Sequence, residues 1–520
     1  MSDKLLFSTS DWTMEKIEKT WEVIDRIAKE KYGLEYPKPQ IEIVTSRQML
    51  HYHSLNGLPF FYDHWSAGKS YVAAHDDYQE GKSSLAYETI INTDPTICYI
   101  METNSMTMQA LVMAHAVVGH GSMFKLNECF KAWTNPESVL SYAKFAKKFV
   151  EDCEQKYGIA RVEHILDAAH ALSNLGIDKY ERIRLKRDGE LKKLDLERRL
   201  YMEKIYNEVW STLPKKKNST AERPVMDFPW PFPEENVLYF IEKNSPSLEE
   251  WERELIHIVR YFAQYYYPQM QCKLMHEGWA SFWHYTIMND LFEEGYINEG
   301  SMLEFLDSHA AVCSDWTGTD PEKGPAIEGF NPYNLGFKMF MKIKQACENP
   351  TELDKIEFPG IAGSNWIETF KDIAANYVDS SFVGQFLSSE TAEELGIFSG
   401  RFVKEKETEG MHPLYRFLGP LWKFHVEEIQ DRDKLKTIRR ILSERYSIAN
   451  LYPTIEVVGC DMKSDRRLSL KHIPFEGQAL GENQAKASLK YLNRLWTYPI
   501  SLETIDDTGA PYTRQRNFIK

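Results

Sequence analysis

The chain has 520 residues, of which 43% are hydrophobic and 27% charged, a composition typical of soluble globular proteins. Its length suggests two to four domains, or one large domain with an appendage. A net charge of −15 argues against general nucleic-acid affinity.

The cysteines and the N-terminus bear on cellular location. Seven cysteines are dispersed without CxxC spacing, which argues against a cysteine-rich zinc site and indicates reduced thiols. The first residues lack the pattern of a signal peptide. No stretch of 18 apolar residues occurs, so no membrane span is expected, and we predict a cytoplasmic location.

Helices dominate the predicted elements of the first 400 residues. Residues 11–32 show helical periodicity, 40–45 predict a short strand, and 55–80 predict a loop because of Gly57, Pro59 and Gly68. Further helices are predicted over 105–118, 137–156, 159–173, 189–211, 247–266, 272–294 and 335–347. Five prolines and a lysine run over 213–233 predict an extended linker.

The pattern changes from about residue 420. We predict a strand there, a helix over 433–446, strands over 453–460 and 467–472, and a helix over 482–494. The predicted fold class is therefore mainly α. A large helical domain covers residues 1–400, and a small C-terminal α+β domain covers residues 401–520.

The segment around His115 and His120 is the first metal candidate. On a regular helix two residues five apart point about 140° away from each other, so these histidines would not share a face. A π-bulge would realign them, whereas Gly119 could also end the helix. Ala116 stands where zinc peptidases of the HExxH type carry their general base. The alternative is a pair of hydrogen-bonded core histidines.

A second candidate helix carries Glu277 and His284, seven residues apart and therefore within about 20° of each other. Small residues, Ala280 and Ser281, flank them and leave room for a ligand. The fragment EGWA resembles the helix that supplies the third ligand of gluzincin-type zinc peptidases. We expect a metal-binding or catalytic role for Glu277; the alternative is a buried ion pair with Arg or Lys.

Other polar groups are weaker candidates. Glu163, Asp167 and His170 form a similar stripe, which suits a helical carboxylate–histidine metal centre or a solvated helix face. His64, Lys69 and Glu88 lie among aromatic residues and could contact a substrate or act as an acid–base pair. Glu102 and Asn104 precede the His115 helix and are similar candidates.

Together these segments resemble the SpoVR family, the stage V sporulation protein R-like proteins of bacteria. The resemblance covers nearly the whole chain. It is carried by HWSAGK (64–69), LAYETIIN (85–92), ALVMAHAVVGH (110–120), FKLN (124–127), LDAAHAL (166–172), AQYYYPQMQCKLMHEGWASFWHY (263–285), NPYNLGFKMF (331–340), SFVGQFLS (381–388) and DRRLSLKH (465–472).

The resemblance implies a link to the spore cortex, a peptidoglycan layer. It also implies two partners, a PrkA-type serine kinase and a YeaH/YhbH-like protein. The family more usually has Asn at the position of His276, so we expect His276 not to be an essential ligand. The chain also departs from the family pattern at Gly121, Met123 and Thr103, while His115, His120 and Glu277 remain.

Three functional hypotheses follow. In the first, His115, His120 and Glu277 bind zinc, Glu163 or Glu102 is the base, and a peptide or amide bond of a peptide-containing substrate is hydrolysed. His170, His284, His64, Lys69 and Glu88 would then support the ligands or the substrate. In the second, Glu163, His170, Glu277 and His284 hold iron or manganese. In the third, the chain is a non-enzymatic adaptor in a kinase stress pathway.

Overall fold

The structure, a computed structural model, describes residues 4–55, 57–58, 61–79, 88–180, 230, 232–314, 319–320, 324–325, 331–395, 400–404, 422–426, 432–447, 452–505 and 511–516. The helix predicted over 189–211 lies outside these residues, as does nearly all of the linker predicted over 213–233.

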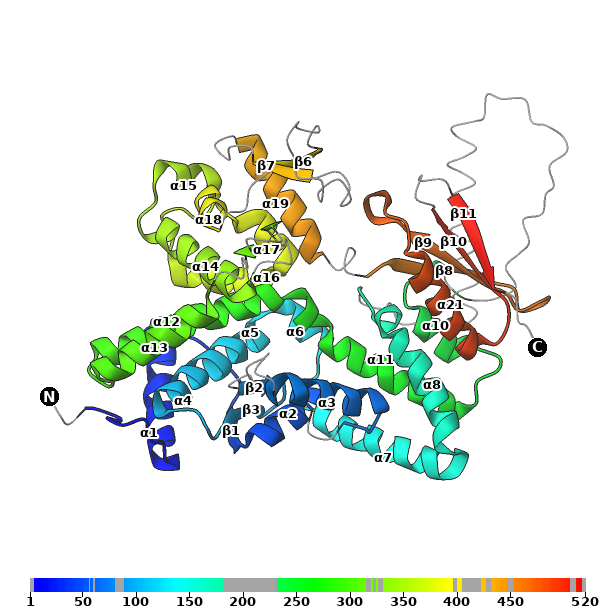
Figure 1. Cartoon of the computed structure of the whole chain (residues 1–520), viewed down its shortest axis with the longest axis horizontal. Helices are drawn as coiled ribbons and strands as arrows, with labels where there is room; N and C mark the ends of the chain where they lie inside the picture. Colours follow the sequence, from blue (N-terminus) through cyan, green and yellow to red (C-terminus); the bar gives the residue numbers. More distant parts are fainter. Residues whose placement is uncertain are drawn as a thin grey trace, which may run out of the picture. The chain divides into compact units, whose positions relative to one another are not determined.

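The chain divides into two compact units, each made of two separate stretches. Unit 1 comprises Met1–Lys148 and Pro268–Leu451, and unit 2 comprises Phe149–Tyr267 and Tyr452–Lys520. The domain boundary expected at residue 400 stays a prediction. The predicted fold class is confirmed, since the described chain is mainly helical and ends in a small region of strands with a helix (Figure 1).

The N-terminal half of unit 1 combines helices with a small sheet. Its elements are α1 (Met14–Arg26), the π-helix η1 (Ile27–Lys31), β1 (Pro39–Val44), α2 (Ser46–Ser54), α3 (Trp65–Gln79), β2 (Glu88–Ile91), β3 (Thr96–Met101), α4 (Met106–Val112), the π-helix η2 (Met113–His120), α5 (Gly121–Leu126), α6 (Glu128–Trp133) and the start of α7 (Val139–Tyr157). The sheet has the order β1-β3-β2, with β1 parallel and β2 antiparallel to β3.

The second stretch of unit 1 is again mainly helical. Its elements are α12 (Lys273–Glu293), α13 (Glu299–Val312), β4 (Thr319–Asp320), β5 (Gly324–Pro325), α14 (Pro332–Glu348), α15 (Glu352–Glu357), α16 (Trp366–Asn376), α17 (Asp379–Phe386), α18 (Ser389–Glu394), β6 (Gly400–Lys404), β7 (Trp422–Val426) and α19 (Arg432–Tyr446). Buried apolar side chains from Phe7 to Leu442 form one core within this unit.

Unit 2 contains a four-stranded sheet and several helices. Its elements are α8 (Ile159–Ala171), the 3₁₀ helix η3 (Ser173–Gly176), α10 (Val237–Asn244), most of α11 (Glu250–Gln271), β8 (Thr454–Cys460), β9 (Leu468–Ile473), the 3₁₀ helix η5 (Phe475–Gly477), α21 (Glu482–Trp496), β10 (Ile500–Ile505) and β11 (Pro511–Arg516). The strand order is β11-β10-β9-β8, and only the β9–β10 pair is parallel.

The loop predicted over 55–80 is wrong in its second half, because Trp65–Gln79 form the helix α3. Gly68 lies inside this helix, and a single glycine costs a helix only about 1 kcal/mol relative to alanine. None of the helices in the described part of the chain is both long and apolar enough to span a membrane.

The helix α12 lies at the centre of unit 1. It packs against η2 on one side and against α14 on the other, and Figure 1 shows α4 and α5, which flank η2, running beside it. Its N-cap residue, Cys272, makes no side-chain cap. The carboxylate of Asp379 caps the helix instead, accepting hydrogen bonds from the backbone N–H groups of Leu274 (2.8 Å) and Met275 (2.9 Å).

Candidate metal site

A π-helical segment brings His115 and His120 together. The segment η2 continues α4 and runs on into α5, so Gly119 does not end the helix. Hydrogen bonds in a π-helix join residues five apart, so His120 lies one turn beyond His115. The centroids of the two imidazole rings are 4.8 Å apart and the rings are perpendicular, at 89°. The irregularity that the spacing suggested is therefore present.

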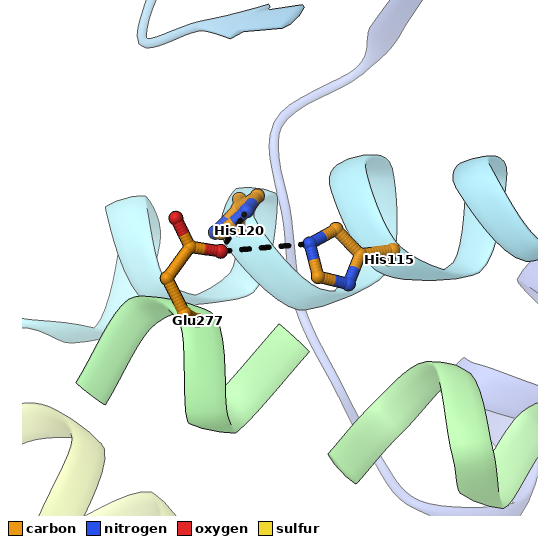
Figure 2. A group of neighbouring side chains, drawn as sticks. All are labelled: His115, His120 and Glu277. Atoms are coloured by element: carbon orange, nitrogen blue, oxygen red, sulfur yellow. Dashed lines mark ion pairs between the residues drawn. The ribbon is translucent and has the colours of Figure 1, made fainter. Parts of the chain in front are cut away.

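Close helix packing brings Glu277 to these histidines. A Cβ atom on Gly119 would lie 2.5 Å from the Cα of Ala280, so only glycine allows η2 to approach α12 this closely. One turn before Ala280, the Oε2 atom of Glu277 lies 3.7 Å from the Nε2 of His115 and 3.6 Å from the Nε2 of His120 (Figure 2).

The three side chains fit a metal ion. Each offers one ligand atom, and these atoms all lie within 4.8 Å of one another. A tetrahedral zinc site with bonds of about 2.0–2.1 Å would hold its ligand atoms roughly 3.4 Å apart. The Oε2 atom of Glu277 is buried and makes no hydrogen bond within the described part of the chain. A carboxylate oxygen in this position is costly without a partner, and a cation supplies one.

The second ring nitrogen of each of the two candidate histidine ligands contacts another histidine. The Nδ1 of His115 lies 2.9 Å from the Nδ1 of His284, whose Nε2 lies 2.8 Å from the Nδ1 of His309. The Nδ1 of His120 lies 3.0 Å from the Nδ1 of His276. His284 was a candidate from the sequence and His309 was not, while His276 was expected only not to be an essential ligand.

Two more polar groups contact the cluster. Glu88, on β2, places its Oε1 atom 3.6 Å from the Nε2 of His115. The ring of Tyr333, near the start of α14, stacks on His115 with 6.2 Å between centroids. Tyr333 was not singled out from the sequence, although it lies in the NPYNLGFKMF segment that carries the family resemblance.

The charges of the cluster shift the pKa values of its members. Burial acts to raise the pKa of Glu277, but the contacts with His115, His120 and Tyr333 outweigh burial and lower it. Burial acts to lower the pKa of His115, but Glu277 and Glu88 outweigh burial and raise it. Burial raises the pKa of Glu88, helped by the charge of Glu277 and opposed by His115. Burial lowers the pKa of His120 to about 4. His120 is therefore neutral near pH 7.

The remaining predicted site residues belong to other elements of the chain. Glu163 and His170 are on α8 in unit 2, so their placement at the cluster stays a prediction. Glu102 follows β3 and is exposed. The Nδ1 of His64 contacts the hydroxyl of Ser66 at 2.7 Å, and Lys69 is exposed on α3. Their roles in substrate binding also stay predictions.

Comparison with known proteins shows the family to which this chain belongs. The family model described as SpoVR like protein matches residues 11–450, and the SpoVR-like C-terminal domain matches residues 453–507. The chain belongs to the SpoVR-like family. It is 41% identical over 500 residues to "Uncharacterized protein YcgB" of Escherichia coli (strain K12), covering 96% of this chain and 94% of that protein. No solved structure matches the chain.

Proposed function

We propose that this SpoVR-like protein is a metal-dependent hydrolase that binds zinc through His115, His120 and Glu277 and cleaves a peptide or amide bond. The observation that carries the proposal is the convergence of two imidazole nitrogens on one buried carboxylate oxygen, which accepts no hydrogen bond from the residues that the structure describes. Two histidines and one carboxylate leave a position open for chemistry, as in catalytic zinc sites.

The chemistry divides between the metal and the chain. A bound zinc ion acts as a Lewis acid and lowers the pKa of water at its open position. We assign the general base to Glu88 rather than to Glu163 or Glu102. Within the described part of the chain, Glu88 is the second carboxylate that lies close to a ligand nitrogen, and burial raises its pKa, which makes it a stronger base. Position 116 cannot supply this group because it is alanine.

The substrate class rests on the family link to the spore cortex. A peptide stem of a peptidoglycan precursor or fragment contains the amide bonds that such a site would hydrolyse. The PrkA-type kinase and the YeaH/YhbH-like protein remain proposed partners on family association alone.

The same ligand set also suits a different metal. Two histidines and one carboxylate form the facial triad of non-haem iron(II) oxygenases, so iron is the second candidate. The iron or manganese centre of four side chains would need Glu163 and His170, which belong to unit 2. The measured metal therefore separates these proposals.

The first experiment is elemental analysis of the full chain. We expect one zinc per chain in the wild type and loss of most of it in His120→Ala and Glu277→Gln. The matched control is Glu242→Gln, because Glu242 is a buried carboxylate that is paired with Arg260 in unit 2. One iron per chain would support the second candidate. Absence of metal would overturn both and favour the adaptor role.

The second experiment tests the base. Release of new amino groups from peptidoglycan peptides is measured for the wild type and for Glu88→Gln. We expect Glu88→Gln to retain zinc and to lose activity by about 10²–10⁴-fold, the usual contribution of a general base. Full activity in Glu88→Gln would reject Glu88 as the base.

A further inference from the structure

The histidines behind the ligands form two chains of direct contacts. One chain runs from His115 through His284 to His309, over distances of 2.9 and 2.8 Å. The other joins His120 to His276 over 3.0 Å. All of these side chains are buried or nearly so, which keeps water from competing for the contacts.

Each imidazole–imidazole contact needs one donor and one acceptor, and this requirement fixes the direction of the whole chain. If the Nε2 of His115 holds a metal, its Nδ1 carries the hydrogen and donates to the Nδ1 of His284. The Nε2 of His284 then carries a hydrogen and donates to the Nδ1 of His309. One ligand contact therefore determines the tautomer of each ring behind it.

The same logic explains an unsatisfied atom. If the Nε2 of His120 holds the metal, its Nδ1 donates to the Nδ1 of His276. The hydrogen of His276 must then sit on its Nε2, and this atom is buried without a hydrogen-bond partner in the described part of the chain. His276 thus leaves its Nε2–H donor without a partner in the described part of the chain, while its Nδ1 accepts the hydrogen of His120.

Aromatic packing holds the longer chain in place. The ring of His284 lies 6.0 Å from that of Phe305, edge to face. The ring of His309 lies 4.7 Å from Phe337 and 5.0 Å from Tyr285. Rings wedged in this way have little freedom to turn, so the acceptor nitrogen of His284 keeps facing His115.

We propose that His284, oriented by His309, is a positioning residue that accepts the Nδ1 hydrogen of His115 and so presents the Nε2 lone pair of His115 to the metal. The proposal rests on the proposed metal site. Partners of this kind raise the basicity of a histidine ligand and fix the ring, and their loss typically lowers metal affinity by about 10- to 100-fold.

The test is zinc affinity of the full chain, measured by competition with a chromophoric chelator. Gln keeps an acceptor at position 284, whereas Leu removes it. We expect His284→Leu to weaken zinc binding by about 10- to 100-fold and His284→Gln to stay within several-fold of wild type. His309→Leu should weaken zinc binding less than His284→Leu does. In the double variant it should add nothing to the effect of His284→Leu, because that substitution has already interrupted the series of histidine contacts.

Two controls separate positioning from folding. His472→Leu removes a comparably buried histidine of unit 2, which contacts Thr504 at 2.9 Å, and should leave zinc affinity unchanged. With cobalt in place of zinc, His284→Leu should alter the visible d–d spectrum at unchanged stoichiometry. His284→Gln and His309→Leu test the idea even if His284→Leu does not fold.

The outcomes are distinguishable. A wild type that binds no zinc contradicts the proposed function. If the wild type binds zinc and His284→Leu, His284→Gln and His309→Leu all bind it with the same affinity as the wild type, only the positioning role is overturned. Equal weakening by Leu and Gln at position 284 overturns it as well, because the acceptor would then not matter.

Discussion

The residue that most sharply separates a metal site from a structural cluster is Glu277. In the wild type we expect a chelator to lower the melting temperature, because bound metal stabilises the folded state. This stabilisation is about 2.7 kcal/mol when the free metal concentration is about 100 times the dissociation constant. Glu277→Gln keeps the shape of the side chain but removes the charge that binds the ion. Its melting temperature should therefore be lower than that of the wild type and insensitive to the chelator.

Glu242→Gln provides the comparison for this melt. It leaves Arg260 without its buried partner and should destabilise the protein, as breaking a buried ion pair does. Its response to the chelator should nevertheless equal that of the wild type. Equal chelator shifts in wild type and Glu277→Gln would reject the ligand role of Glu277.

His276 gives a second prediction at this scale. Asn can accept the Nδ1 hydrogen of His120 through its side-chain oxygen, so we expect His276→Asn to change zinc affinity by less than about threefold. His276→Leu removes the acceptor and should weaken binding by about 10-fold or more. The same competition assay measures both. A loss of zinc in His276→Asn as large as in His276→Leu would show that the imidazole itself is needed.

Much of the candidate site could be predicted from residue types and spacing. His115, His120 and Glu277 stand out because imidazole and carboxylate groups recur on helices within apolar surroundings. Glu88 was only a weak candidate, since nothing in the sequence places β2 beside the helix of His115. Tyr333 and His309 were missed for the same physical reason: their proximity is created by packing between helices that are far apart in the chain.

At the scale of elements, Gly278 and Gly336 bring α12 and α14 into close contact beside Glu277. A Cβ on Gly278 would lie 2.4 Å from backbone atoms of Gly336. Gly278→Ala should therefore destabilise the protein by about 1–3 kcal/mol or more, the usual cost of overpacking. It should also weaken zinc binding, because Glu277 is the adjacent residue.

Gly68→Ala is the matched control. Gly68 lies within α3, and a Cβ there would meet nothing within 4 Å. Alanine should therefore stabilise this helix by about 0.5–1 kcal/mol. Urea unfolding measures both variants. A Gly278→Ala protein as stable as Gly68→Ala would contradict the close packing of α12 on α14.

Helical periodicity located the long helices well but not the irregular elements. The helix expected over 105–118 is α4 and η2 in the structure, and the π-helical part packs closely against α12 at Gly119 and Ala280. The strand β3 escaped prediction because it is buried along its whole length and shows no alternation of apolar and polar residues. The strand β2 also escaped prediction, and at four residues it is too short to show a clear period.

At the scale of the whole molecule, each unit has its own core and its own buried charge. In unit 2 burial acts to raise the pKa of Glu242, but His257, Arg260 and Lys243 outweigh burial and lower it to about 2. A lowered carboxylate pKa gives stability that is fully present above the unfolded-state value and is lost as the pH falls toward the folded-state value.

Acid should therefore remove the contribution of Glu242. The difference in unfolding free energy between wild type and Glu242→Gln should shrink by up to about 3 kcal/mol between roughly pH 6 and pH 2, at about 1.4 kcal/mol per pKa unit. Urea unfolding at several pH values measures it. A difference that stays constant over this range would show that Glu242 is not held ionised by its partners.

Removal of the metal should destabilise unit 1 rather than unit 2. All three candidate ligands lie in unit 1, on η2 and α12, whose buried side chains belong to the same core. Unit 2 has a separate set of buried side chains, including Phe240 and Trp496, with ring centroids 5.9 Å apart. A ligand that binds only the folded state slows the opening of the elements that form its site.

Hydrogen exchange of the full chain with and without a chelator tests this expectation. Chelation should speed amide exchange in Met113–His120 and Lys273–Glu293 by roughly 10- to 100-fold, the range that corresponds to about 1.4–2.7 kcal/mol of lost metal stabilisation. Exchange in β9 and β10 should not change. Glu277→Gln should exchange fast in the same two segments without chelator. An equal increase of the exchange rate in both units would mean that the metal stabilises the whole chain rather than this site. No increase in either unit would mean that these helices are rigid without metal.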